Sequence, residues 1–168
     1  PNMAIRMARL LEPFAPFSFE EPVPPENVAE MAKVARAINI PVATGERLYT
    51  RWAYRELLEQ QAADYIQPDL CHCGGFSEGR KIASMAETYH VRVLPHNPNG
   101  PISTLVGLHF GLSTPNFEML EYPRQPPDQL PLLRHMPQVV NGRIAAPSRP
   151  GWGVEVDEEF LKQFPQEL

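Results

Sequence analysis

The chain of 168 residues has very little cysteine, no excess of positive charge and no long apolar run. Its two cysteines, Cys71 and Cys73, are one residue apart and form no disulfide framework, so the composition fits a reducing compartment and predicts a cytoplasmic protein. No segment approaches the roughly 18 apolar residues of a membrane span, so no membrane contact is expected. The net charge of −5 argues against nucleic-acid binding, which depends on clustered Lys and Arg.

Five short apolar runs in the chain each end on an acidic residue or a histidine. Successive members of this set are 23 to 27 residues apart, and they are Glu20, Glu46, Asp69, His96 and Glu121. That spacing is about the length of one strand, one helix and two short loops. A β/α barrel repeats such units, and the carboxyl ends of its strands meet at the mouth that carries the active site. We therefore expect the five residues to form one candidate active site.

The segments around this set predict alternating strands and helices. Short runs rich in β-branched or aromatic residues and bounded by Pro, Gly or Asn predict strands, at residues 17–19, 41–43, 65–67, 91–94 and 117–120. Apolar residues at offsets of three and four predict helices, at about 2–12, 28–38, 51–61, 76–89 and 102–113. Strands that alternate with helices favour parallel pairing, since parallel neighbours need a crossover connection.

The chain is too short for a complete barrel, which takes about 250 residues and eight strands. It also begins within a predicted helix, so we predict an α/β fold that is the C-terminal portion, about five βα units, of a TIM-type β/α barrel. Residues 1–121 are predicted to form this partial catalytic barrel, and residues 122–168 a C-terminal tail that packs on the barrel or on a missing capping domain. The incomplete barrel would leave apolar edges at 17–19 and 117–120, and such edges favour association into a homo-oligomer.

The tail differs in composition from the barrel. Seven prolines between residues 123 and 150 favour an extended, irregular chain. Asn141-Gly142 predicts a turn between two short extended pieces. Asp157 is predicted to cap a last short helix that ends at Phe164.

The side chain that ends each strand indicates a chemical role. Glu20 and Glu46 end adjacent strands, so their carboxylates can share one hard cation, and Mg²⁺ is the cation that such oxygen ligands suggest. Two carboxylates need a further ligand, because Mg²⁺ is normally also held by substrate oxygens or another protein group. Asp69 and His96 end neighbouring strands, and a carboxylate bonded to one imidazole nitrogen makes the other nitrogen a better base. That pair is a candidate general acid/base dyad.

Simpler interpretations of these residues stay open. A carboxylate at a strand end is often only solvated, and Asp69 alone could cap the following helix. The Cys71-His72-Cys73 segment suggests zinc, although no second ligand cluster completes a four-coordinate site. Arg47, beside a proposed metal ligand, is a candidate substrate contact, whereas Glu21 is expected to be a structural salt-bridge acid.

Several longer strings carry a family resemblance. They are Phe19-Glu-Glu-Pro-Val23, Ala43-Thr-Gly-Glu-Arg-Leu-Tyr49, Gln67-Pro-Asp-Leu70, Gly74-Gly75, Leu94-Pro-His96 and the acid Glu121. In residue type and spacing they resemble the enolase superfamily, and within it the mandelate racemase/muconate lactonizing enzyme family. The closest likeness is to sugar-acid dehydratases of the galactonate dehydratase type, and it runs through almost the whole chain.

The resemblance implies a role for each residue of the set. Glu20 and Glu46 would be two of three carboxylate ligands of an essential Mg²⁺, which stabilises the enediolate formed when a proton leaves C2 of the substrate. His96, paired with Asp69, would move that proton, and Glu121 would hydrogen-bond the substrate carboxylate. The implied reaction is dehydration of a galactonate-like aldonic acid, a small-molecule partner, to a 2-keto-3-deoxy acid.

Part of the family pattern is absent from this sequence. The third carboxylate ligand, a histidine that follows it and an N-terminal capping domain precede the matching segment in the family. Two alternatives therefore stay open, namely a racemase, epimerase or cycloisomerase of the same superfamily, and a truncated barrel fragment without turnover. An Asp-x-His motif upstream in the reading frame would favour the dehydratase.

Overall fold

A computed structural model describes residues 1–122 and 132–164. Its central element is a four-stranded sheet in the order β1-β2-β3-β4, and all three pairings are parallel as predicted. The strands are β1 (Phe19–Glu20), β2 (Val42–Thr44), β3 (Tyr65–Ile66) and β4 (Arg92–Val93). Part of the proline-rich stretch predicted to be irregular, residues 123–131, lies outside the described residues.

The fifth predicted strand, residues 117–120, is shorter than expected. Phe117 forms a single parallel bridge with Val93. Val93 donates its N–H to the carbonyl of Asn116 and accepts the N–H of Glu118, each at 2.9 Å, so the sheet continues by one residue pair. Beyond Glu118 the chain is held by side-chain hydrogen bonds from a neighbouring loop instead of by a strand ladder.

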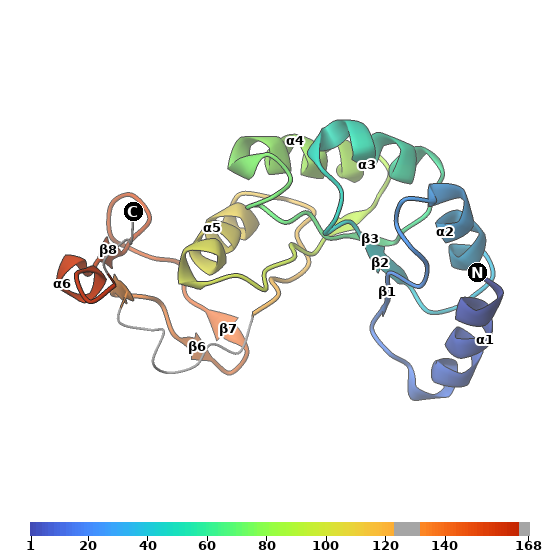
Figure 1. The fold of residues 1–168 in the computed structure, drawn as a ribbon, viewed down its shortest axis with the longest axis horizontal. Coiled ribbons are helices and arrows are strands. Elements are labelled where there is room, and N and C mark those ends of the chain that lie inside the picture. Colours follow the sequence, from blue (N-terminus) through green and yellow to red (C-terminus); the bar gives the residue numbers. More distant parts are fainter. Residues whose placement is uncertain (123–131, 165–168) are drawn as a thin grey trace.

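Five helices occur where the apolar spacing predicts them. They are α1 (Asn2–Leu11), α2 (Val28–Ala35), α3 (Thr50–Glu59), α4 (Gly75–Glu87) and α5 (Pro101–Leu112). Helix α2 ends three residues earlier than predicted, because Ala37 donates its N–H to the carbonyl of Val34 and tightens the last turn. Figure 1 shows α3 and α4 side by side above the sheet. None of the helices in the described part of the chain is long and apolar enough to cross a membrane.

The hydrophobic core lies between the helices and the sheet. Helix residues Met31, Leu58 and Ile82 are almost completely buried, together with Val42 and Val93 of the strands. Burying a side chain of this size stabilises the fold by about 1.5–3 kcal/mol. This packing fixes the strands in register, and so determines where the residues at their carboxyl ends lie.

The tail forms small antiparallel pairs. Strand β5 (Leu133–Arg134) pairs with β8 (Glu155–Val156), and β6 (Val139–Val140) pairs with β7 (Arg143–Ile144). The predicted turn at Asn141-Gly142 joins β6 to β7. Its two residues have φ of 51° and 72°, as the common two-residue hairpin turn requires.

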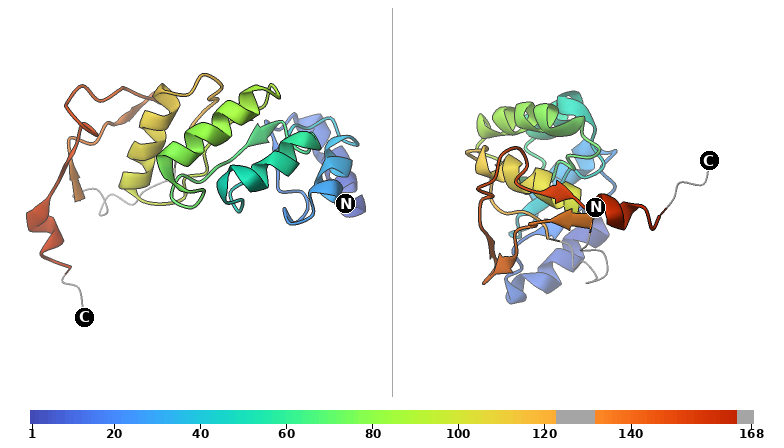
Figure 2. Two further views of the ribbon diagram at one scale, coloured as in Figure 1. Left: turned by 90° about the horizontal axis from the view of Figure 1, so that it is seen from above. Right: turned by 90° about the vertical axis from the view of Figure 1, so that its left-hand side faces the viewer.

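A short helix ends the described tail. Helix α6 (Glu158–Leu161) is capped by Asp157 as predicted, since Oδ1 of Asp157 accepts the N–H of Phe160 at 3.1 Å. The helix stops before the predicted end at Phe164. Figure 2 shows α6 extending away from the sheet and its helices.

One tryptophan attaches the tail to the barrel helices. The Trp152 ring packs edge-on against His109 of α5, with ring centroids 5.0 Å apart, and against Phe76 of α4 at 6.3 Å. Its carbonyl also lies 3.1 Å from Nε2 of His109. The tail therefore contacts α4 and α5 through this tryptophan.

Candidate active site

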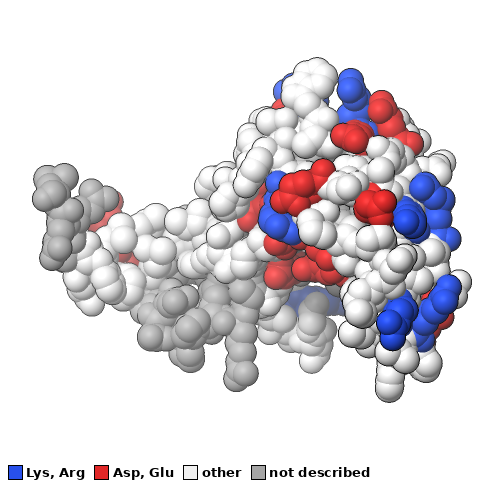
Figure 3. All heavy atoms as spheres, turned by 45° about the vertical axis from the view of Figure 1, so that its right-hand side comes forward, with Lys and Arg blue, Asp and Glu red and all other residues white. Residues whose placement is uncertain are grey.

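The five predicted site residues follow the strands in order along one edge of the sheet. Glu20 is the last residue of β1, and Glu46, Asp69 and His96 come shortly after β2, β3 and β4. Glu121 follows the single bridge beside β4. Because the strands are parallel, their carboxyl ends share one edge, which is where β/α barrels carry their active sites. Figure 3 shows Asp and Glu side chains gathered in the middle of one face, with Lys or Arg beside them.

Asp69 and His96 form a hydrogen-bonded pair. Oδ2 of Asp69 lies 2.9 Å from Nδ1 of His96, and a carboxylate in that position favours the proton on Nδ1 and leaves Nε2 to act as a base. Asp69 is only 1% exposed. Its Oδ1 accepts the N–H of Cys71 at 2.7 Å, and its Oδ2 also accepts from Nδ2 of Asn99 at 3.2 Å. These bonds satisfy the buried carboxylate and hold it in one orientation.

The second nitrogen of His96 faces another carboxylate. Nε2 lies 3.2 Å from Oε2 of Glu46, and both side chains are partly buried, with 20% of His96 and 25% of Glu46 exposed. The imidazole therefore connects the ends of β2 and β3 and lies between two acids. An imidazolium at this position would have a carboxylate at each nitrogen.

Glu20 and Glu46 supply carboxylate oxygens from adjacent strands. Residues 1–122 and 132–164 contain no group of three His, Cys, Asp or Glu side chains arranged to hold a metal ion. The two carboxylates nevertheless fit a hard cation such as Mg²⁺, which prefers oxygen ligands and usually takes only one or two from protein carboxylates. Such a cation would complete its coordination with oxygens of substrate, water or other protein groups.

Arg47 is held by a carboxylate outside the predicted set. Its Nη2 and Nε lie 2.6 and 3.0 Å from Oε2 of Glu21, which confirms Glu21 as a salt-bridge acid. The hydrogen bond to Glu21 raises the pKa of Arg47 above its usual value. Arg47 is half exposed, and its Nη1 lies 3.8 Å from Glu26. The guanidinium therefore lies near the proposed metal ligands but is already engaged by acids.

Asn97 determines where Glu121 lies. Its backbone N–H donates to Oε2 of Glu121 at 2.7 Å, and its Nδ2 donates to the Glu121 carbonyl at 2.9 Å. The same Nδ2 donates to Oγ1 of Thr104 in α5 at 2.9 Å. Asn97 directly follows His96 and is 2% exposed, so one buried residue links the proposed base to the acid of the next strand position.

Sequence reasoning missed three amide side chains in this site. Gln67, Asn97 and Asn99 each hold one of the predicted acids by a hydrogen bond. Gln67 belongs to a string that carries the family resemblance, and the two asparagines closely follow His96. Polar residues directly after buried strand runs are the signal that could have identified them.

The Cys71-His72-Cys73 segment, which suggested zinc, lies in the loop between β3 and α4. Burial raises the pKa of the Cys73 thiol to about 11. Cys71 is exposed. Within the described residues these side chains belong to no group of three or more ligating residues arranged to hold a metal ion.

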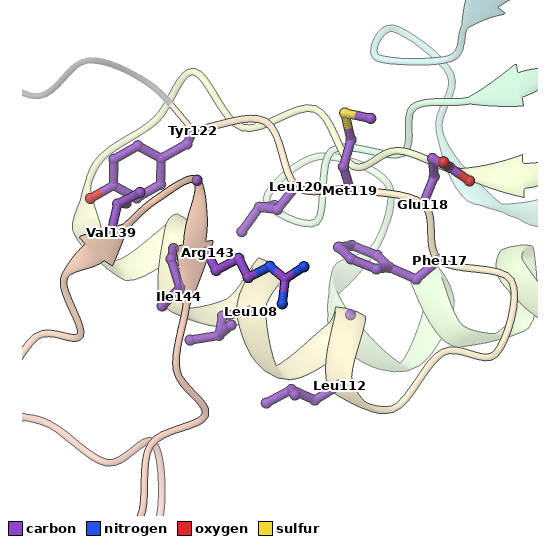
Figure 4. A pocket seen from close by; sticks show the side chains of 12 residues that line it. Leu108, Leu112, Phe117, Glu118, Met119, Leu120, Tyr122, Val139, Arg143 and Ile144 are labelled. Carbon is purple, nitrogen blue, oxygen red and sulfur yellow. The ribbon is translucent and has the colours of Figure 1, made fainter.

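A separate apolar groove lies between α5, residues 117–122 and the β6–β7 hairpin. It encloses about 470 Å³, and Figure 4 shows Phe117 and Leu120 on one side of it, facing Arg143 of β7. None of the five predicted site residues lines this groove. The groove is therefore distinct from the row of acids at the strand ends.

The parallel βα repeat with acids at the strand ends defines the catalytic barrel domain of the enolase type. The family described as enolase C-terminal domain-like matches residues 1–160. The chain belongs to this family, which confirms both the predicted superfamily and the predicted fold, the later part of a TIM-type barrel.

Several longer proteins are similar to this chain. A D-galactonate dehydratase of Xanthomonas euvesicatoria pv. vesicatoria (strain 85-10) is 39% identical over 96% of this chain and 44% of its own length. A D-mannonate dehydratase of Caulobacter sp. (strain K31) is 35% identical over 98% of this chain and 41% of its own length. The crystal structure of a mandelate racemase/muconate lactonizing enzyme-like protein from Roseovarius sp. TM1035 has a TM-score of 0.91 at 43% identity, covering 96% of this chain and 41% of that one. The chain thus spans about two-fifths of the length of these relatives.

Proposed function

We propose that the protein containing this chain is a Mg²⁺-dependent dehydratase that converts a galactonate-like aldonic acid to a 2-keto-3-deoxy acid. The observation that carries the proposal is the hydrogen-bonded pair of Asp69 and His96 at the sheet edge where the other acids lie. The similarity to a galactonate dehydratase and a mannonate dehydratase supports a sugar acid as the substrate class.

In the proposed reaction, Nε2 of His96 takes the proton from C2 of the substrate. Asp69 holds the imidazole through Nδ1 and stabilises the imidazolium that forms. Glu46, 3.2 Å from Nε2, adds a second negative charge beside the same ring. General acid/base help of this kind contributes about 10²–10⁴-fold to a reaction rate.

The remaining residues of the set would bind the cation and the substrate. Glu20 and Glu46 would hold Mg²⁺ through carboxylate oxygens. Bound Mg²⁺ would supply positive charge next to the substrate carboxylate, where negative charge develops when the C2 proton leaves. Glu121, fixed by Asn97, would hydrogen-bond the substrate carboxylate, and Arg47 would contact the substrate from the rim.

A racemase, epimerase or cycloisomerase of the same family is the second candidate. The structural likeness to a mandelate racemase/muconate lactonizing enzyme-like protein favours it. Its chemistry would use the same Asp69 and His96 pair, because these reactions can also begin with removal of a proton next to a carboxylate. The candidates differ in whether a β-hydroxyl leaves the substrate.

The test is a screen of the full-length protein with Mg²⁺ against acid sugars that include galactonate and mannonate. We expect a 2-keto-3-deoxy product, detected as the semicarbazone of the 2-keto acid. Exchange of the C2 proton for deuterium without a keto product would favour the second candidate. If no acid sugar gave either a keto product or exchange of the C2 proton, the result would contradict both candidate functions.

A further inference from the structure

Gln67 connects the first and third strands of the sheet at their carboxyl ends. It directly follows β3 and is 4% exposed, and its Nε2 donates to Oε2 of Glu20 at 2.8 Å across the intervening strand β2. Its backbone N–H donates to the carbonyl of Thr44 at 3.0 Å. The approach is close because Gly45 has φ of 135° and no side chain, and a Cβ there would lie 3.0 Å from the Gln67 nitrogen. Both the backbone and the side chain of Gln67 are therefore held in place.

The chemistry of the contact fixes how the amide of Gln67 points. An ionised carboxylate only accepts hydrogen bonds, so the amide nitrogen faces Glu20 and the amide oxygen faces away. That oxygen, Oε1, is buried and has no hydrogen-bond partner in the described part of the chain. The amide of Gln67 therefore presents one uncharged donor to Glu20.

An uncharged donor suits a carboxylate that also binds a cation. A lysine or arginine at this position would compete with the cation for the negative charge of Glu20. The Gln67 amide instead donates a hydrogen bond to Oε2 of Glu20 without adding charge, so Oε1 would be the freer oxygen for the cation. Single-oxygen ligation suits Mg²⁺, which needs six well-placed ligands, whereas Ca²⁺ readily takes both oxygens of one carboxylate.

We propose that Gln67 is a positioning residue that restricts Glu20 to a single-oxygen ligand and thereby makes the site prefer Mg²⁺ over Ca²⁺. This inference rests on the proposed function, in which Glu20 is a ligand of Mg²⁺. Removing an outer partner of a metal ligand commonly lowers metal affinity 10–100-fold. The ratio of Mg²⁺ to Ca²⁺ affinity is the more specific readout, because a general loss of structure would weaken both cations together.

The test is calorimetric titration of the metal-free, full-length protein with Mg²⁺ and with Ca²⁺. Gln67→Met keeps the volume of the side chain and removes the donor. We expect its Mg²⁺ affinity to fall at least about tenfold and its Ca²⁺ affinity to fall less, so the affinity ratio decreases. Gln67→Asn keeps an amide but is one methylene too short to reach Glu20, and it should reproduce the lower ratio if Gln67→Met does not fold.

Asn116 offers a matched control. It is also an amide whose oxygen is buried and has no hydrogen-bond partner among the residues that the structure describes. Its Nδ2 donates to the carbonyls of Ala83 and Val91 at 3.0 and 2.9 Å, which are not part of the row of acids. Asn116→Leu should lower thermal stability and leave the affinity ratio unchanged. A wild-type ratio in folded Gln67→Met or Gln67→Asn would overturn the role of Gln67. Wild-type Mg²⁺ binding by Glu20→Gln would instead overturn the proposed metal site, and the role of Gln67 with it.

Discussion

Oδ2 of Asp69 lies 2.9 Å from Nδ1 of His96, although the two residues are 27 positions apart in the chain. The register of the sheet explains the contact. Ile66 of β3 is paired with Val93 of β4, and each site residue lies three positions beyond its strand partner. Two loops of equal length thus bring a carboxylate and an imidazole to the same level. A slip of one residue between β3 and β4 would separate them and turn the strand side chains to opposite faces.

Replacing Asp69 tests the dyad. Asp69→Asn should lower kcat of the full-length enzyme by about 10²–10⁴, because the neutral amide no longer favours the proton on Nδ1 of His96 or stabilises the imidazolium. His96→Asn should in addition stop exchange of the C2 proton with deuterium, followed by NMR. Exchange at the wild-type rate in His96→Asn would remove this histidine from the mechanism.

Replacing Glu46 tests the metal site. Glu46→Gln should abolish turnover while leaving the circular dichroism spectrum of the protein unchanged, since it removes a proposed ligand and the carboxylate beside Nε2 of His96. EDTA should abolish turnover of the wild-type enzyme, and added Mg²⁺ should restore it. Full activity of the wild-type enzyme in EDTA would contradict the proposal of a metal-dependent reaction.

Removing the side chain of Asn97 should reduce stability. Asn97→Ala loses the hydrogen bonds to Thr104 and to the Glu121 carbonyl, and we expect a loss of about 1–3 kcal/mol in the free energy of unfolding in urea. Asn39→Ala is the control, because Asn39 is exposed and surface substitutions usually change stability by about 0.5 kcal/mol or less. Equal effects of the two substitutions would show that the Asn97 contacts contribute little.

Burial of Cys73 is expected to make the fold less stable as the pH rises into the alkaline range. Burial raises the pKa of its thiol from 9.0 to about 11, so the folded protein keeps the proton at pH values where the unfolded chain has lost it. The stabilisation is complete below about pH 9 and is lost as the pH rises to about 11. The free energy of unfolding in urea should therefore decline less over this pH range for Cys73→Ala than for the wild-type protein. Cys71→Ala, at an exposed position, should match wild type.

The helix α1 end of the 168-residue chain exposes several large apolar side chains. Met3, Leu10 and Phe14 are 67%, 70% and 80% exposed, and apolar surface of this extent is often an interface. We expect the 168 residues alone to self-associate in light scattering and to lack turnover. Leu10→Lys should reduce association of the 168-residue chain. A monodisperse, active monomer of these residues would contradict this expectation.

Most of the fold was predictable because each βα unit has its own local sequence pattern. The apolar periodicity of α3 or α4 and the short run of β3 each lie within one stretch of sequence, and their regular recurrence predicts parallel order. The exception is the chain at 117–120, where only Phe117 pairs with β4. Whether such an apolar run completes a ladder depends on neighbours that its own sequence does not specify.

The hydrogen bonds that support the site were not predictable in the same way. Gln67 and its partner Glu20 are 47 positions apart in the sequence, and Asn99 and its partner Asp69 are 30 positions apart. Neither sequence separation follows from a helical or strand period. Side-chain amides carry little hydrophobic signal, so only the folded arrangement reveals their partners. The role of Arg47 was unclear from sequence for a related reason, since its main partner, Glu21, lies on the preceding βα unit.

The segment that suggested zinc serves Asp69 through its backbone. The N–H of Cys71 donates to the Asp69 carboxylate, and the N–H groups of His72 and Cys73 both donate to the Asp69 carbonyl, at 3.0 and 2.7 Å. Three successive peptide groups thus wrap around one acid, and they do so whichever side chains they carry. The exposed Cys71 side chain can therefore change with little effect on the chemistry, whereas the His72 imidazole lies 3.9 Å from Oδ2 of Asp69. Deleting a single residue from this loop would release the acid that orients the imidazole.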